Sequence, residues 1–296
     1  REASLGKSSA SIYNYVSVDN LNPITGRVPE GIEGAARLIV GLSVETAELV
    51  AAGKFSKAIG IGGGLHHAKP SFGEGFCFYN DIAVCVEVLK KKYNLKRILV
   101  LDTDAHAGNG TGEIFYEDPS VLFVDIHQDP RTVYPGTGFI QEIGKDKGEG
   151  FTVNIPLPPG TACDAYQYIF DEIVFPLTRE FEPELIIRYG GSDPHYLDDL
   201  TVLGLTISGF KMLGSLVREV AQKVCEGKCI DFLTSGYNLE ILPFAWTALI
   251  SGFLNLEIDL SGANEKAPPP RDYQLQETKE VVTQLKKILC KYWSLK

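Results

Sequence analysis

Short apolar runs separated by longer amphipathic segments are the feature that most constrains the fold of this 296-residue chain. Several of these runs are continuously apolar rather than alternating, which is typical of central strands that are covered on both faces. The segments between them carry helical periodicity or a helix start signal such as Asn80-Asp81. We expect strands at 57–61, 97–101, 121–126, 151–155, 184–189 and 230–233, and helices at 32–52, 81–93, 165–180, 209–226, 243–256 and 276–293.

This alternation of strands and helices predicts an α/β fold with a mostly parallel central sheet and helices on both faces. Because no internal repeat and no long linker divides the chain, residues 1–296 are expected to form a single domain. A loop is expected at 267–270, where Ala is followed by three prolines. Within the first 30 residues, 12–18 is the one candidate strand.

Composition and charge narrow the classes of protein to which this chain can belong. With 28 Lys and Arg against 38 Asp and Glu, the net charge is −10, so no direct nucleic-acid partner is expected and a cationic substrate is favoured. The six cysteines lack paired zinc-knuckle spacing and are expected to be free thiols in a reducing compartment. Neither a membrane span nor a signal peptide is expected, and a cytoplasmic location (nuclear in a eukaryote) is predicted.

The residues that could carry chemistry follow the predicted strands, where ligands bind in open α/β sheets. Asp104 and His106 are two apart, so in an extended segment both side chains can point to the same side. Acids such as Asp102 and Asp104 at the end of an apolar strand are costly without a counter-charge. A metal ion is the simplest counter-charge, although a pair of acids capping a turn has the same pattern.

Three further segments add candidates. Asp193 in GGSD would supply a third ligand, and two carboxylates with one imidazole leave the open position that catalytic zinc sites require. His66 and His67, after three glycines, could act as an acid/base pair, and Tyr237 in SGYN could donate a hydrogen bond to an oxyanion. Taken singly, Asp193 is explained equally well as a loop acid, and an isolated pair of histidines is weak evidence. Tyr237 alone is better explained as a tyrosine packed in a loop.

Taken together, the segments GGGLHHAKP, GEGFCFYND, VLDTDAHAGNGT, HQDPRTVYPGTG, GGSD and SGYN resemble the zinc-dependent histone deacetylase family. That family includes bacterial and archaeal relatives and the acetylpolyamine amidohydrolases. The resemblance runs from about Glu30 to about Leu256. It implies an arginase/deacetylase-like fold and an amidohydrolase that removes acetyl or other acyl groups from lysine side chains or related amines. The implied partners are an acyl-lysine protein or peptide, or an acylated polyamine, and the oligomeric state stays open.

The resemblance also implies a role for each matching residue. The ligands of Zn²⁺ would be Asp104, His106 and Asp193, the acid/base pair would be His66 and His67, and Tyr237 would stabilise the oxyanion. The substrate would contact Gly75, Phe76, Tyr134 and Leu200 in a tunnel, with Asp19 as the candidate rim aspartate. Asp102 would orient His66, Asn109 would face His67, Asp198 aligns with an aspartate near the zinc, and a structural K⁺ or Na⁺ would lie near Asp102 and Asp125.

Some positions depart from the family pattern, which leaves substrate preference and rate open. Ala107 stands where a second histidine is common, and Thr234 and Ser235 stand where glycines often precede the tyrosine. The usual Gly-Asp-Pro after the third ligand is replaced by 197–199, Leu-Asp-Asp. His195 matches no family role and is expected to be a loop histidine near the rim.

Three other kinds of function are alternatives for this sequence. A manganese ureohydrolase of the arginase type would need more Asp and His than Ala105, Ala107 and Asn109 offer. A non-catalytic binder of acyl-lysine or acetate would need neither the histidine pair nor Tyr237. A structural subunit that docks basic partners on its acidic surface is compatible with a domain that also catalyses.

Overall fold

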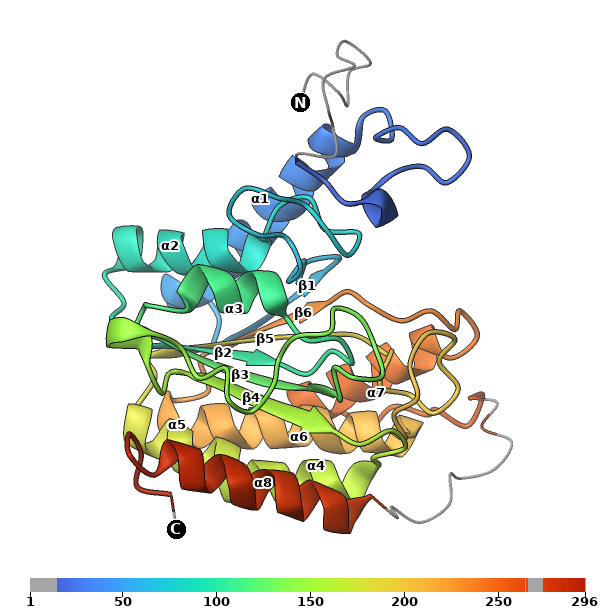
Figure 1. Ribbon diagram of the computed structural model, residues 1–296. Coiled ribbons are helices and arrows are strands. Elements are labelled where there is room, and N and C mark those ends of the chain that lie inside the picture. Colours follow the sequence, from blue (N-terminus) through green and yellow to red (C-terminus); the bar gives the residue numbers. More distant parts are fainter. Residues whose placement is uncertain (1–14, 264, 266–273, 296) are drawn as a thin grey trace.

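The computed structural model describes residues 15–263, 265 and 274–295, and a six-stranded parallel sheet lies at their centre (Figure 1). The strand order is β1-β6-β5-β2-β3-β4. The strands are β1 (Lys57–Ile61), β2 (Ile98–Asp102), β3 (Val121–Gln128), β4 (Thr152–Leu157), β5 (Leu185–Tyr189) and β6 (Cys229–Leu233). Every pairing in this sheet is parallel, so the predicted α/β class is confirmed and the sheet is all-parallel rather than mostly parallel.

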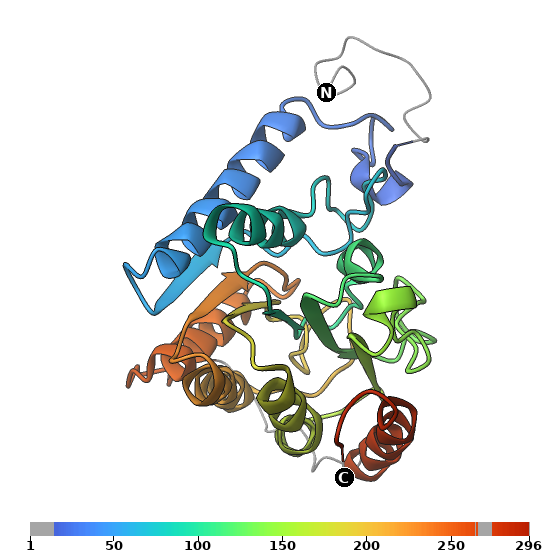
Figure 2. The same ribbon diagram turned by 90° about the vertical axis from the view of Figure 1, so that its left-hand side faces the viewer.

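Helices cover both faces of the sheet (Figures 1 and 2). One face carries α1 (Ile32–Ala51), α2 (Asp81–Tyr93) and α3 (Asn109–Phe115). The other face carries α4 (Cys163–Ile169), α5 (Phe175–Phe181), α6 (Ile207–Val224), α7 (Leu242–Leu254) and α8 (Leu275–Leu289). No helix in the described residues is both long and apolar enough to span a membrane.

The continuous apolar runs are explained by the two cores that these layers enclose. In β2, Leu99 and Leu101 pack into the core beneath α4–α8, whereas Ile98 and Val100 pack into the core beneath α1 and α2. Because successive side chains of a strand point to opposite faces, a strand covered on both sides must be apolar at every position. All five residues of β2 are buried, including Asp102 at its end.

Some elements differ from the predictions. The helix expected at 165–180 is instead α4 and α5, joined by a π-helical turn over Phe170–Val174. The short helix α3 was not predicted, because Gly110 and Gly112 weaken the helical pattern. Residues 12–14 and 267–270 lie outside the described residues, and Val16 makes only an isolated bridge to Gly73. All six cysteines are free thiols, as expected.

The strand register brings four chain segments together at one edge of the sheet. Asp102, the last residue of β2, lies opposite Tyr189 on β5 and Asp125 on β3. Ile61 at the end of β1 lies opposite Leu233 at the end of β6. The loops that follow β1, β2, β5 and β6 therefore leave the sheet side by side, and these loops contain most of the candidate site residues.

Candidate active site

Asp104, His106 and Asp193 form a compact cluster above the ends of β2 and β5. One ligand atom from each residue lies within 4.8 Å of the others, and all three residues are buried. The Nδ1 atom of His106 is 3.1 Å from Oδ1 of Asp104 and 3.0 Å from Oδ2 of Asp193. In the described part of the chain this is the only group of three or more His, Cys, Asp or Glu side chains with metal-binding geometry.

Local hydrogen bonds shape the turn that presents these ligands. The amide of Asp104 donates to Oδ1 of Asp102 (2.9 Å), and the amide of His106 donates to Oδ1 of Asp104 (2.9 Å). Aspartate side chains commonly stabilise turns in this way. The loop after β5 approaches so closely that a Cβ atom at Gly190 would lie 2.6 Å from the amide nitrogen of Asp104, and φ there is +133°. Only glycine fits this position without strain.

The electrostatics of this cluster suit a bound cation. Burial and the nearby charge of Asp104 raise the pKa of Asp193 to about 7. Burial lowers the pKa of His106, but its hydrogen bonds and ion pairs with Asp104 and Asp193 outweigh that effect and raise the pKa to about 10. A metal ion would replace the His106 proton, since metal ligands must be deprotonated. Two carboxylates and one imidazole thus form a possible metal site.

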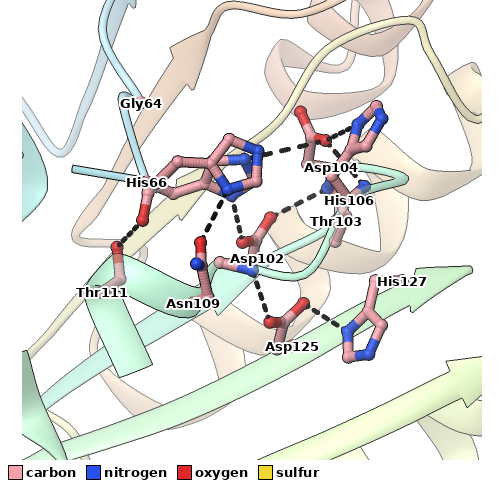
Figure 3. Close-up of polar contacts among 12 residues, drawn as sticks. Gly64, His66, Asp102, Thr103, Asp104, His106, Asn109, Thr111, Asp125 and His127 are labelled. Atoms are coloured by element: carbon pink, nitrogen blue, oxygen red, sulfur yellow. Dashed lines mark hydrogen bonds and ion pairs between the residues drawn. The ribbon is translucent and has the colours of Figure 1, made fainter. Parts of the chain in front are cut away.

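The two adjacent histidines have different partners, and Figure 3 shows the contact between His66 and Asp102. Nδ1 of His66 lies 2.7 Å from Oδ2 of Asp102, and Nδ1 of His67 lies 2.8 Å from Oδ1 of Asn109. Burial lowers the pKa of His66, but the charges of Asp102 and Asp104 outweigh it and raise the pKa to about 9. Burial and the charge of His66 lower the pKa of His67 well below its usual value. The pKa values of the two rings therefore diverge although their centroids are only 4.0 Å apart.

The loop that carries the histidine pair is fixed from two sides. Oxygens of Asp81, the first residue of α2, accept hydrogen bonds from the amides of Gly64 (2.9 Å) and Leu65 (2.7 Å). On the other side, a Cβ atom at Gly75 would lie 2.2 Å from the His67 ring, and φ at Gly75 is +57°. Glycine at position 75 therefore allows the main chain to lie directly against the His67 ring.

Tyr237 lies beside His106 of the cluster. Its ring centroid is 6.2 Å from that of His106, and its amide donates a 2.8 Å hydrogen bond to Oδ2 of Asp198. Burial and the charges of Asp104 and Asp193 raise the pKa of Tyr237. The phenol therefore stays protonated and can act as a hydrogen-bond donor.

The predicted substrate-contacting residues lie around this site. Phe76, Tyr134 and Leu200 have exposed fractions of 60%, 43% and 54%, respectively. The Tyr134 ring is 5.0 Å from that of His67, and the Leu200 amide donates to Asp198, which also binds the Tyr237 amide. Asp19 contacts the main chain, because its Oδ2 accepts a 2.6 Å hydrogen bond from the Gly75 amide.

The residues predicted near a monovalent cation lie side by side on β2 and β3. Asp102 and Asp125 are register partners, and both are buried. Oδ2 of Asp125 accepts from the Gly108 amide (2.9 Å), and Oδ1 lies 2.8 Å from Nδ1 of His127 (Figure 3). The K⁺ or Na⁺ site remains a prediction.

The interpretation of His195 as a rim histidine is wrong. Its side chain is completely buried, stacked on Tyr196 (4.6 Å between centroids) and Phe210 (6.2 Å), and its Nε2 lies 3.1 Å from Oε1 of Glu265. Burial lowers its pKa. His195 is therefore a packed histidine on the α6 side of the sheet, and its loop position in the sequence did not reveal this.

Sequence reasoning missed two side chains near the cluster. The Ser235 hydroxyl donates a hydrogen bond to Oδ2 of Asp104, and its Oγ lies 3.0 Å from Oδ1 of Asp193. Arg188 is fully buried on β5, where it binds Asp231 (2.8 Å) and Oγ1 of Thr103 (3.0 Å). A charged residue within each of the apolar runs LIIRY and CIDFL was the available signal for the Arg188–Asp231 pair.

The fold and the site together define an α/β protein of the deacetylase type with a possible metal centre at the carboxyl edge of its sheet. The comparison with known families agrees, because the model of the histone deacetylase domain matches residues 7–253. The chain belongs to the histone deacetylase family.

Several known proteins are similar to this chain in sequence. A probable deacetylase of Archaeoglobus fulgidus is 38% identical over 273 residues, which is 90% of this chain and 75% of that protein. The chloroplastic histone deacetylase 10 of Oryza sativa subsp. japonica is 42% identical over 64% of this chain, and the acetoin utilization protein AcuC of Staphylococcus xylosus is 38% identical over 71%. The matches span only 42% and 54% of those two proteins.

A solved structure is similar throughout most of the fold. The crystal structure of the HDA15 HD domain superposes with a TM-score of 0.74 and 29% sequence identity. The match covers 88% of this chain and 70% of that chain.

Proposed function

We propose that this protein is a zinc-dependent amidohydrolase that removes acetyl or other acyl groups from lysine side chains or related amines. The observation that carries the proposal is the proximity of three groups: the Asp104–His106–Asp193 cluster, the His66–His67 pair and Tyr237. The His67 and Tyr237 rings lie 6.0 Å and 6.2 Å from the His106 ring, respectively. The family membership and the relatives named as deacetylases support it. An acetylpolyamine or another small amide is the alternative substrate.

Zinc is the metal that fits the donor set best, because two carboxylate oxygens and one imidazole nitrogen leave an open fourth position. When bound there, Zn²⁺ would polarise the amide carbonyl and lower the pKa of a coordinated water. A two-manganese ureohydrolase is less well supported, since the described residues contain a single cluster of three ligands.

The residues of the chain then have separate tasks. With its Nδ1 facing the Asn109 oxygen, neutral His67 has a free Nε2 that accepts a proton from the attacking water. It returns this proton to the leaving nitrogen as the C–N bond breaks, which yields a carboxylic acid and a free amine. His66, charged beside Asp102, stabilises negative charge that develops nearby. The Tyr237 hydroxyl donates a hydrogen bond to the oxygen of the former carbonyl.

The exposed residues beside the site are compatible with an aliphatic acyl-amine substrate. Phe76, Tyr134 and Leu200 expose apolar surface beside the site, which suits the methylene chain of lysine. The net charge of −10 suits a cationic peptide or polyamine. Neither feature selects between the two amines, so a substrate panel must decide.

The first test is Y237F with Y134F as the matched control, since each change removes one phenol oxygen beside the site. We expect Y237F to retain zinc and to lose about 10²–10³-fold in kcat on an acetyl-lysine peptide, the usual effect of losing one oxyanion donor. Y134F keeps the ring that packs on His67 and should keep most of the turnover. Unchanged turnover in Y237F would remove Tyr237 from the mechanism.

The same assay identifies the substrate class. Acetyl-lysine peptides, acetylated polyamines and longer acyl-lysines would be compared at equal concentration with the zinc-loaded protein. A higher kcat/KM on peptides assigns a protein deacylase, and a higher value on polyamines assigns the alternative. Absence of hydrolysis across the panel, together with no inhibition by a hydroxamate chelator, would contradict the proposed function.

A further inference from the structure

The two carboxylates of the candidate metal site have a second polar neighbour besides His106. His106 Nδ1 contacts Oδ1 of Asp104 and Oδ2 of Asp193. Ser235 Oγ contacts the other oxygen of each carboxylate, donating to Oδ2 of Asp104 and lying 3.0 Å from Oδ1 of Asp193. The imidazole and the hydroxyl therefore contact different oxygens of both acids.

The main chain holds Ser235 rigidly in this place. Its carbonyl oxygen accepts hydrogen bonds from the Ser192 amide (2.9 Å) and from Nε1 of Trp246 (3.2 Å). The loop after β5 also packs tightly on it, because a Cβ atom at Gly191 would lie 1.8 Å from the Ser235 oxygen. The main chain that carries the hydroxyl is therefore held in place by hydrogen bonds and by close packing.

A hydroxyl group has one proton, so it can donate to only one of two carboxylates at a time. Its oxygen lone pairs then face the other carboxylate, and this contact is unfavourable unless positive charge lies nearby. Protonated His106 supplies that charge in the absence of metal, and a divalent cation between Asp104, His106 and Asp193 would supply it when bound. Two ionised acids, one imidazole and one hydroxyl thus form a set that is complementary to a bound cation.

We propose that Ser235 is a positioning residue of the metal site, whose hydroxyl holds one oxygen of Asp104 and one of Asp193 so that the remaining donors converge on a single ion. The proposal rests on the proposed function only in assuming that a metal binds these three ligands. It assigns a role to a position where the family pattern often has a glycine, which has no side-chain atom to offer. Partners that orient metal ligands commonly contribute 10–100-fold to metal affinity.

The test measures metal binding rather than turnover. Zinc affinity would be determined by competition with a chromophoric chelator for the wild type, S235A, S235G and S235T, and the visible spectrum of each Co²⁺ form would be recorded. S251A is the matched control, because it also removes a hydroxyl whose hydrogen bond is internal, here to the Leu256 carbonyl at the C-terminal end of α7. Far-UV circular dichroism would verify that each variant is folded.

We expect S235A and S235G to bind zinc about tenfold or more weakly and to show an altered Co²⁺ spectrum. S235T keeps a hydroxyl on Cβ and should recover most of the affinity, and S251A should match the wild type. Wild-type affinity and spectrum in both S235A and S235G would overturn the role of Ser235 while leaving the metal site intact. A wild-type protein that binds no zinc would overturn both this role and the proposed function.

Discussion

At the scale of single residues, two neighbouring histidines acquire different pKa values from their surroundings. His66 and His67 are adjacent in sequence and both are buried. Burial disfavours the charged form of each ring, yet a carboxylate contacts His66 whereas a neutral amide contacts His67. The resulting pKa values diverge, about 9 for His66 and well below 6.5 for His67. The carboxylates near His66 raise its pKa, whereas burial and the charge of His66 lower the pKa of His67, so His67 is the ring that can accept a proton near neutral pH.

D102N tests this explanation, because asparagine has the same shape without the charge. The pKa of His66 should fall from about 9 toward or below 6.5, because burial lowers this pKa and the charge of Asp102 would no longer raise it. At pH 7.5, His66 would change from mostly charged to mostly neutral. An NMR titration of the imidazole in protein prepared without metal measures the shift. D118N, far from the site on a surface ion pair with Lys90, is the control, and a His66 pKa equal to that of the wild type in D102N would refute the explanation.

At the scale of elements, α6 and α7 pack together through two glycines. A Cβ atom at Gly214 on α6 would lie 2.1 Å from the Leu249 oxygen, and one at Gly252 on α7 would lie 1.9 Å from the Lys211 oxygen. Neither glycine has a positive φ, so both are needed for close approach rather than for a special backbone conformation. In contrast, a Cβ atom at Gly41 on the exposed side of α1 would meet nothing within 4 Å.

Replacement of glycine by alanine is expected to have opposite effects on the free energy of unfolding at positions 252 and 41. G252A should lower the free energy of unfolding by about 1–3 kcal/mol, because the added methyl group forces the two helices apart. G41A should raise it by about 0.5–1 kcal/mol, since alanine is the better helix former. Urea denaturation of both variants and the wild type measures the differences. Equal effects of the two substitutions would show that the close α6–α7 contact does not limit stability.

At the scale of the whole molecule, the site joins segments that are far apart in the sequence. Asp104 and His106 follow β2, Asp193 follows β5, and Ser235 and Tyr237 follow β6. Beneath them, buried Arg188 connects β5 to β6 through Asp231 and to the β2 turn through Thr103. A cation bound to Asp104, His106 and Asp193 would add a further link between these segments, so its binding should stabilise the entire fold.

We therefore expect zinc to raise the thermal unfolding midpoint and a chelator to reverse the change. At a free zinc concentration 100 times the Kd, the stabilisation should be about 2.7 kcal/mol. H106A removes one ligand and should abolish the zinc-dependent shift, which differential scanning calorimetry can measure. A shift in H106A as large as in the wild type would place the bound metal elsewhere on the protein.

Local sequence determined the strands, most of the helices and the three candidate metal ligands that the fold brings together. A strand buried on both faces must be apolar throughout, so its position can be read from the residues alone. Motifs such as VLDTDAHAGNGT place acids and imidazoles next to strand ends, where a parallel sheet gathers them. These features depend on neighbours in the sequence or on a general property of the fold.

Only the tertiary structure decided the features that depend on contacts between distant segments. The burial of His195 against Phe210, the Arg188–Asp231 pair and the approach of Ser235 to both acids each join residues from different elements. The short helix α3 forms although its glycines weaken it, because Gly110 packs on the His67–Ala68 main chain and Gly112 packs on Phe123. Packing free energy from distant partners outweighs local preference at these positions, and a single sequence does not record which partners will meet.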